Sequence, residues 1–225
     1  VAAGSERYRR AIGVYLKSLG RKDIRLVETE GDPTLGRMRN LSLEAARGEI
    51  LCQWDDDDLY HPDRMSVQWR RMQEADARAC FFVDVLQFDL TERTLCWIDW
   101  SALEQVKAGY QWIPGTVMIE NDTRLRYPEE GDAAGSGEDS ALIDRFSADL
   151  KMTGLRKAGY LYVYRYHGRN TVPRARHRAM TLNHVVSDAF VRSREAEFRS
   201  ALHYYRLPRP YVVRTGRGTL NLAES

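Results

Sequence analysis

Helical and strand-like patterns of apolar residues alternate along the first third of the chain. Apolar positions recur every three or four residues in three segments, which predicts three helices. The first helix is expected to run from a Ser5 N-cap to Gly20, and the second over residues 34–47 with Gly48 as its C-cap. The third is expected to begin at His61-Pro62-Asp63, and its apolar stripe is formed by Met65, Trp69 and Met72. Between them, residues 24–27 and 50–54 are short apolar runs that we expect to be buried strands.

The rest of the chain continues in the same way. We expect strands over residues 79–88, 94–100, 116–120 and 160–166, a loop over 126–137, and helices over 138–150 and 182–205, followed by a tail rich in Pro and Arg. Helices that alternate with short buried strands predict an α/β fold, in which a mostly parallel central sheet is flanked by helices.

Composition narrows the class of protein. The chain has 225 residues and 43% hydrophobic content, which is enough for one substantial core. Its 34 basic and 32 acidic side chains nearly cancel, so the charge balance does not indicate nucleic-acid binding. Cys52, Cys80 and Cys96 are widely spaced in apolar segments, which indicates buried thiols in a reducing compartment, the cytoplasm, and neither disulfides nor a zinc site.

Four consecutive aspartates, Asp55 to Asp58, follow the apolar run that ends at Trp54. In α/β sheets, ligands bind where strands reach their carboxyl ends, and this run occupies such a place. Four like charges need a counter-charge, and a divalent cation is the simplest one because hard cations take carboxylate oxygens. A solvated acidic turn is the alternative interpretation, and the flanking sequence favours the cation.

The segments around this run resemble family 2 glycosyltransferases of the GT-A fold. The family pattern reads Arg-Asn, a helix ending in Ala-x-Gly-Glu, a strand, Asp-x-Asp-Asp, a short spacer, and Pro before a helix. The matching stretches here are Arg39-Asn40, Ala46-Arg47-Gly48-Glu49, Asp55-Asp56-Asp57-Asp58, Pro62, and further on Pro114-Gly115-Thr116, Gly137-Glu138-Asp139-Ser140 and Tyr166-His167-Gly168-Arg169-Asn170-Thr171. The resemblance covers about residues 1–172, the expected GT-A-like catalytic domain, and leaves 173–225 as a helical C-terminal extension and tail.

The resemblance implies a chemistry for particular residues. It implies a metal-dependent, inverting transfer of a sugar from a nucleotide-diphosphate donor, with a UDP-sugar favoured and Mn²⁺ or Mg²⁺ as the cofactor. Asp57 is expected to hold the metal with Asp55 and His167 as further ligands, and Asp55 or Asp56 to lie near the ribose. Four aspartates allow two Asp-x-Asp registers, and Asp58 is expected only to cap the following turn.

Two further residues receive roles from the resemblance. Asp139 is expected to be the general base that takes the proton of the acceptor hydroxyl. The alternative is that Glu138 and Asp139 only complement the dipole of the helix that they open. Arg39 is expected to contact the donor nucleotide or diphosphate, and pairing with a carboxylate inside the fold is its alternative. Asn40 is expected to be structural.

The acceptor implied is a glycan or a lipid-linked sugar in surface-polysaccharide synthesis. Aromatic residues could stack on an acceptor sugar or belong to the core, and they are Trp97, Trp100, Tyr110 and Trp112. The basic residues of 174–178 could close over the diphosphate, touch an anionic lipid or stay solvated. Peripheral association with the inner face of a membrane and formation of a homo-oligomer are left open.

The first residues depart from the family pattern. Val1-Ala2-Ala3-Gly4-Ser5 stands where the family often reads Val-Asp-Asp-Gly-Ser, so we expect the family's first strand and helix to be missing. This favours one rival, a non-catalytic module that binds nucleotides or glycans. A second rival is a nucleotidyltransferase, which should carry a Gly-rich phosphate loop with Lys or Arg, and the chain contains none.

Overall fold

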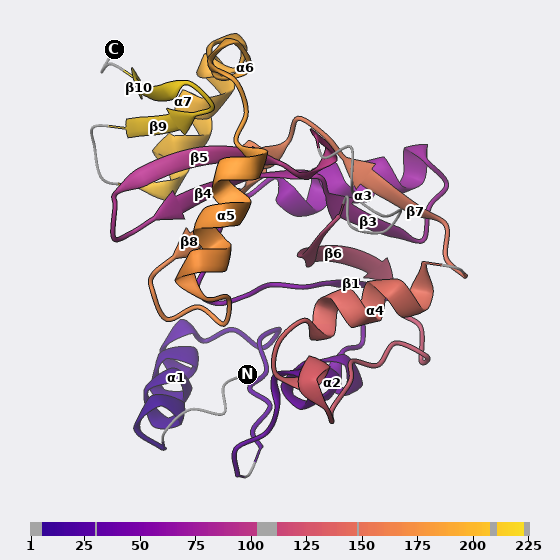
Figure 1. Ribbon diagram of the computed structural model, residues 1–225. Helices are drawn as coiled ribbons and strands as arrows, with labels where there is room; N and C mark the ends of the chain where they lie inside the picture. Colours follow the sequence, from indigo (N-terminus) through magenta and orange to yellow (C-terminus); the bar gives the residue numbers. More distant parts are fainter. Residues whose placement is uncertain (1–5, 30, 103–111, 148, 208–210, 223–225) are drawn as a thin grey trace. The chain divides into compact units, whose positions relative to one another are not determined.

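The computed structural model describes residues 6–29, 31–102, 112–147, 149–207 and 211–222. The chain divides into two compact units (Figure 1). Unit 1 comprises residues 1–51 and 121–146, and unit 2 comprises residues 52–120 and 147–225. The predicted Ser5 cap and Tyr110 lie outside the described residues.

Unit 1 is helical. It contains α1 (Glu6–Leu19), α2 (Leu35–Ala45), the short 3-10 helix η2 (Asp132–Ala134) and α4 (Glu138–Phe146). As predicted, α1 ends at Gly20, which has a φ of 61° that glycine adopts without strain. The side chain of Thr34 caps α2 by accepting the N–H of Arg37 at 3.3 Å.

Two local predictions in unit 1 are wrong. Residues 24–27 belong to none of the strands in the described part of the chain. The C-cap of α2 is Ala46 and not Gly48, since the N–H of Ala46 already closes the last turn onto the carbonyl of Leu43. The expected strand over 50–54 is shortened to β1 (Ile50–Cys52), which is half-buried and crosses the boundary between the units.

The first sheet of unit 2 runs in the order β6-β3-β7, formed by β6 (Ile113–Glu120), β3 (Ala79–Phe82) and β7 (Met152–Leu155). β3 pairs antiparallel with β6 and parallel with β7. The strand β7 was not predicted, because four residues are too few for a periodic signal. The N–H of Gln53 donates to the carbonyl of Val117 at 2.9 Å, so the segment leading to the aspartates runs along β6.

Helix α3 (Arg64–Glu74) packs against β3 and β7 with a different face from the one predicted. Met65 and Trp69 are exposed by 53% and 43%, whereas Arg64, Gln68 and Met72 are buried. Arg64 and Gln68 can face inward because their polar ends reach the carbonyl of Thr116, at 3.2 and 2.7 Å respectively. Of the predicted stripe, Met72 is therefore confirmed, whereas hydrophobicity alone places Met65 and Trp69 on the wrong side of the helix.

The second sheet of unit 2 has the order β10-β9-β5-β4-β8-β2. Its strands are β10 (Gly218–Leu222), β9 (Tyr211–Thr215), β5 (Thr94–Asp99), β4 (Asp84–Asp89), β8 (Tyr162–Tyr166) and β2 (Leu59–Tyr60). β9 pairs parallel with β5, and β4 pairs parallel with β8, while the other pairings are antiparallel. The α/β class is confirmed, but the pairing is mixed and not mostly parallel.

The single strand expected over 79–88 is two strands that belong to different sheets. Phe82 is paired in the first sheet, and Asp84 pairs with Asp99 in the second. Val83 lies between them, donating its N–H to Leu155 and accepting that of Trp100 through its carbonyl. An uninterrupted apolar run cannot reveal such a change of sheet, since both strands are buried. Trp100–Ala102 (η1) and Gly159–Leu161 (η3) are 3-10 helices flanking β5 and β8.

The one helix predicted over 182–205 is wrong. The structure has α5 (Arg174–His184), α6 (Asp188–Ser193) and α7 (Glu195–Tyr205). The chain leaves α5 because Val186 donates its N–H to the carbonyl of Trp97 at 3.1 Å, and Ser187 then caps α6. The tail forms the hairpin of β9 and β10, so the C-terminal part is not helical throughout and completes the second sheet.

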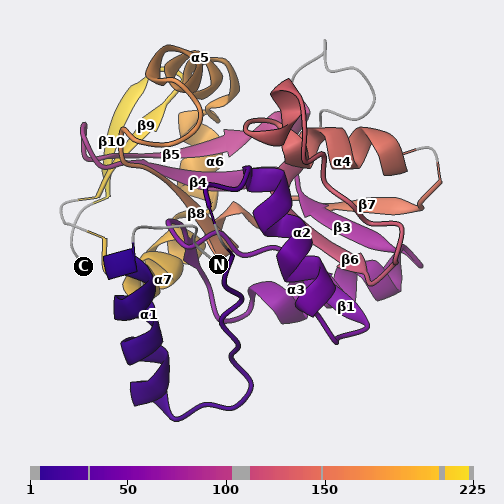
Figure 2. The same ribbon diagram turned by 90° about the horizontal axis from the view of Figure 1, so that it is seen from below.

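Helices cover both faces of the second sheet. Figure 2 shows α5 on one face of β4 and β5, with α7 on the other. Leu86, Trp97 and Val163 face α6 and α7, where they form a core with Val191, Phe198 and Leu202. Cys80 and Cys96 are buried and Cys52 is half-buried, and all three are free thiols, as predicted. No helix in the described part of the chain has the length and apolar character that crossing a membrane requires.

Candidate functional site

The four aspartates follow β1 and differ sharply in environment. Asp56 is exposed, Asp55 and Asp57 are half-buried, and Asp58 is buried at 8% exposure. The differences arise because β2 begins directly after the turn and draws Asp58 toward β8. The run is therefore one polar turn with a buried anchor at its end.

Asp58 holds the turn onto β8. Its carboxylate accepts the hydroxyl of Tyr162 and the backbone N–H of Arg165, the latter at 2.8 Å. Arg165 also donates its Nε to the carbonyl of Asp57. Burial raises the pKa of Asp58 to about 7, although the bonds from Tyr162 and Arg165 act in the opposite direction. The prediction that Asp58 only caps the turn is wrong, because its partners lie about a hundred residues away in the chain.

Asp57 faces His167, the residue after β8. Its Oδ2 lies 3.1 Å from Nε2 of His167, and the two side chains are 42% and 31% exposed. Nδ1 of His167 accepts the N–H of Arg169 at 3.2 Å, so a neutral imidazole carries its proton on Nε2, toward Asp57. The structure thus brings together two of the residues that the sequence assigned to one site.

Asn170 fixes the segment that carries His167. Its Oδ1 accepts the N–H of His167, and its Nδ2 donates to the carbonyl of Arg165, both at 2.9 Å. The side-chain amide therefore closes the loop from Arg165 to Asn170 at the end of β8. The sequence places Asn170 in the motif that follows Tyr166 but indicates no role for its side chain.

Asp55 is held at the other end of the turn. Its backbone N–H donates to the hydroxyl of Tyr60 at 2.8 Å, and Nε2 of Gln53 lies 3.3 Å from both carboxylate oxygens. The ring of Tyr60 in turn stacks on Tyr162 with centroids 5.2 Å apart. Tyr60 and Tyr162 thus join the two ends of the acidic turn through one aromatic stack.

A buried cation lies beneath this stack. The guanidinium of Arg64 is 4.6 Å from the ring centroid of Tyr60 and 4.9 Å from that of Trp54. Arg64 is fully buried, and its charge lies close to the acidic turn. Sequence reasoning missed it, and the only signal was that an Arg directly follows the His-Pro-Asp that opens α3.

The remaining predicted site residues belong to unit 1. Arg39 donates its Nε to Oε1 of Glu138 at 2.7 Å, with the two side chains 15% and 3% exposed. This is the carboxylate pairing that stood as the alternative to a donor contact. Asp139, in the first turn of α4, is half-buried and accepts the N–H of Ser140 at 2.7 Å. Asn40 is structural, as predicted, since it bonds both the N–H and the carbonyl of Tyr127.

The aromatic candidates separate into different environments. Trp97 is fully buried in the core beneath α6 and α7. Trp112 packs beside Phe81 with ring centroids 5.8 Å apart, and Trp100 is half-buried. The core interpretation therefore holds for Trp97, while stacking on an acceptor stays a prediction for Trp100 and Trp112.

The acidic turn offers few protein ligands to a metal ion. Within the described ranges, no group of three or more His, Cys, Asp and Glu side chains is arranged to hold one. Asp57 and His167 nevertheless present an oxygen and a nitrogen next to each other at a half-exposed position, and Mn²⁺ accepts both donor types once Nε2 of His167 has given up its proton. The pair fits a cation that takes its other ligands from a bound substrate and water.

The sequence of this chain is similar to a known protein family, and its fold is similar to those of known proteins. The family model described as glycosyl transferase family 2 matches residues 4–124. No curated protein sequence matches the chain. The crystal structure of S. aureus TarS 1-349 aligns with a TM-score of 0.50 and 12% identity, covering 87% of this chain and 59% of that one. The same protein in complex with UDP aligns with a TM-score of 0.51 and 14% identity, covering 92% and 64%.

The likeness to these structures concerns the fold. With the family match, it establishes the GT-A fold for this chain. The chain spans about three fifths of the length of the TarS structures that it matches, at 59% and 64%.

Proposed function

Because the chain belongs to glycosyl transferase family 2, we propose that the protein transfers a sugar from a nucleotide-diphosphate donor to a glycan or lipid-linked acceptor. The observation that carries the proposal is the contact between Asp57 and His167 on a turn anchored by Asp58. UDP is the proposed nucleotide, and the TarS structure in complex with UDP supports that choice. The whole reaction is proposed for the complete protein, since the chain covers only part of its structural relatives.

A divalent cation, Mn²⁺ or Mg²⁺, is proposed at Asp57 and His167, with Asp55 as a further ligand. When bound, the cation would offset the negative charge that develops on the diphosphate leaving group. The chain's own part is to hold these donors in place: Asp58 and Arg165 fix the turn, and Asn170 fixes the backbone of His167. Asp56 is exposed beside them and is proposed to contact the ribose.

Asp139 is proposed as the general base of an inverting transfer. It would take the proton of the acceptor hydroxyl as that oxygen bonds to the sugar and the bond from sugar to phosphate breaks. Of the two acidic residues that open α4, Glu138 is buried and paired with Arg39, whereas Asp139 is half-buried. This difference supports Asp139 for the role. A donor contact by Arg39 would compete with its ion pair to Glu138.

The acceptor is proposed to belong to surface-polysaccharide synthesis, at the cytoplasmic side of a membrane. Three free thiols support a reducing compartment. The chain would therefore meet its donor in the cytoplasm and its acceptor either there or at the inner face of the membrane.

Calorimetric titration of UDP with and without Mn²⁺ tests the donor site. The parent chain should bind UDP only with the metal, and Asp57→Asn should weaken binding at least about tenfold, or ~1.4 kcal/mol. Asp76→Asn is the matched control: its side chain is 97% exposed, and Asn tolerates its φ of 48°. Equal affinity for UDP in Asp57→Asn and in the parent chain would contradict the proposed donor site.

Analysis of the reaction products then distinguishes sugar transfer from the two alternative functions, nucleotidyl transfer and binding without catalysis. Incubation with a UDP-sugar and acceptor should release UDP in the parent protein and not in Asp139→Asn, which should still bind UDP. Release of pyrophosphate would instead indicate a nucleotidyltransferase. Metal-dependent UDP binding without turnover in the complete protein would indicate a non-catalytic module.

A further inference from the structure

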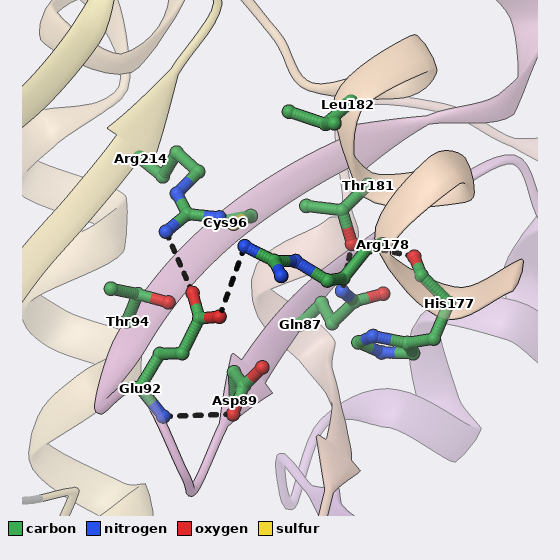
Figure 3. A pocket seen from close by; sticks show the side chains of 10 residues that line it. All are labelled: Gln87, Asp89, Glu92, Thr94, Cys96, His177, Arg178, Thr181, Leu182 and Arg214. Carbon is green, nitrogen blue, oxygen red and sulfur yellow. Dashed lines mark hydrogen bonds and ion pairs between the residues drawn. The ribbon is translucent and has the colours of Figure 1, made fainter. Parts of the chain in front are cut away.

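Unit 2 contains a cavity on the α5 face of its second sheet. It lies between α5, the strands β4 and β5 with the turn that joins them, and β9 (Figure 3). Its volume is about 40 Å³. One buried water needs roughly 10–15 Å³ on a comparable measure, so the cavity has room for several water molecules or for one small polar ion.

His177 lines this cavity with two unpaired nitrogens. Its side chain is 2% exposed, and neither Nδ1 nor Nε2 has a hydrogen-bond partner among the described residues. The ring stacks on Tyr166 at a centroid distance of 3.9 Å, which fixes its orientation. Burial lowers the pKa of His177, against the charges of Asp89 and Glu92, so the ring is neutral at pH 7. Buried polar atoms normally have partners, so these nitrogens call for a bound group.

Arginine side chains gather around Glu92, in the turn between β4 and β5. Glu92 has three guanidinium groups around it, those of Arg214 at 2.8 Å, Arg174 at 3.5 Å and Arg178 at 3.6 Å. Figure 3 shows Arg178 and Arg214 converging on this one carboxylate. Two of the three ion pairs are longer than a hydrogen bond, so those head groups are loosely held.

Two acidic side chains, Glu92 and Asp89, also line the cavity, and Asp89 is engaged by its own turn. Asp89 uses its Oδ1 to accept the N–H groups of Thr91 and Glu92 and the hydroxyl of Thr91, which shapes the turn between β4 and β5. Two guanidinium groups, those of Arg178 and Arg214, line the cavity together with these two carboxylates, and Arg174 contacts Glu92 as well. A cavity lined by guanidinium donors and by an imidazole with unpaired nitrogens suits an anion with several acceptor oxygens.

We propose that this cavity binds a small oxyanion of the phosphate class. Arg178 and Arg214 would donate to its oxygens, since the planar guanidinium matches phosphate geometry. His177 would donate one ring N–H from the inner wall and so gain a partner. Free phosphate and the phosphoryl end of a phosphate monoester share this chemistry, and both would leave Glu92 in place.

The proposed oxyanion site is separate from the acidic turn. One link between them runs along the end of β8, where Tyr166 stacks on His177 and the next residue, His167, faces Asp57. The proposed oxyanion site therefore does not depend on sugar transfer. An experiment that contradicts one of the two proposals does not contradict the other.

Titration of inorganic phosphate, at ionic strength held constant with chloride, tests the site by the assigned ring signals of His177 in NMR. We expect a saturable shift of the His177 signals in the parent chain, with an affinity at least about tenfold lower in Arg178→Met. Arg178 is 57% exposed at its side chain, so its replacement should not prevent folding. Arg192→Met is the matched control, an exposed arginine on α6, and should bind phosphate like the parent.

Parallel titration with glycerol 3-phosphate distinguishes the two sources. Tighter binding of the monoester indicates the phosphoryl end of a larger molecule, and preference for inorganic phosphate indicates the free ion. Two results would overturn the inference: His177 signals that do not respond to either compound while those of His167 do, or equal affinities in Arg178→Met and Arg192→Met. The first would place the anion at the acidic turn.

Discussion

The carboxylate of Asp58 accepts the backbone N–H of Arg165 at 2.8 Å, across a separation of 107 residues in the chain. This bond fixes the acidic turn to β8, and the segment following β8 then places His167 beside Asp57. The geometry of the exposed pair therefore depends on a buried residue that need not touch a substrate.

Replacing Asp58 should separate the effect of hydrogen bonding from that of charge. Asp58→Ala leaves the N–H of Arg165 and the hydroxyl of Tyr162 without their acceptor, so it should lower the free energy of unfolding by about 1–3 kcal/mol. Asp58→Asn should cost less, because its Oδ1 can still accept the N–H and the tyrosine hydroxyl can rotate to accept from the amide. Urea unfolding of both variants measures the difference.

Asp56→Ala is the control for this comparison, since Asp56 is exposed in the same turn and should change the stability little. Equal losses in Asp58→Ala and Asp56→Ala would show that the anchor at Asp58 does not stabilise the fold.

A second buried carboxylate should make the stability depend on pH. Asp84 is 2% exposed, and burial raises its pKa from 3.8 to about 6, although its oxygens accept the N–H groups of Lys157 and Ala158. Between these two values the folded chain binds a proton that the unfolded chain has released. Its contribution to stability is therefore complete below about pH 4 and falls as the pH rises toward 6, by about 3 kcal/mol at most.

Asp84→Asn removes this titration and resembles the protonated form. The stability of Asp84→Asn should fall less steeply than that of the parent between about pH 4 and pH 6, as measured by urea unfolding at a series of pH values. Parallel pH profiles for the two proteins would mean that Asp84 titrates near its ordinary pKa in the folded chain.

Arg64 should not tolerate lysine. Its guanidinium donates to Gln68 and to the carbonyl of Thr116, both at 3.2 Å, while stacking against Tyr60 and Trp54. A lysine ammonium lacks the planar fork that makes these contacts together, so Arg64→Lys should destabilise the chain by about 1–3 kcal/mol. Thermal or urea unfolding provides the measurement.

Arg70→Lys tests the same exchange at an exposed position of the same helix, where we expect little change. If the two lysine variants unfold alike, the buried guanidinium is not what holds α3 beneath the aromatic stack.

Local patterns in the sequence were sufficient to predict several secondary-structure elements. The apolar period of α1 and its terminal glycine predicted that helix nearly to the residue, and Thr34 marked the start of α2. These features depend on neighbours within one turn, which a sequence displays directly. The break between the strands predicted over 79–88 and 94–100 was also confirmed, since β4 ends at Asp89 and β5 begins at Thr94.

Other elements depended on partners that are distant in the chain. The buried face of α3 carries Arg64 and Gln68, which apolar periodicity would assign to solvent, because carbonyls of other strands satisfy their polar ends. The helix predicted over 182–205 breaks where Val186 pairs with Trp97. No local pattern records either partner.

The sequence by itself determined the family, the order of its motifs and the acidic turn as the candidate site. Tertiary structure alone decided which aspartate is buried, that Arg39 pairs with Glu138, and that His177 faces a cavity with its nitrogens unpaired. The reason is that residue type and spacing fix the chemistry available to a segment, whereas burial and pairing of a polar group depend on residues that only the folded chain brings to it.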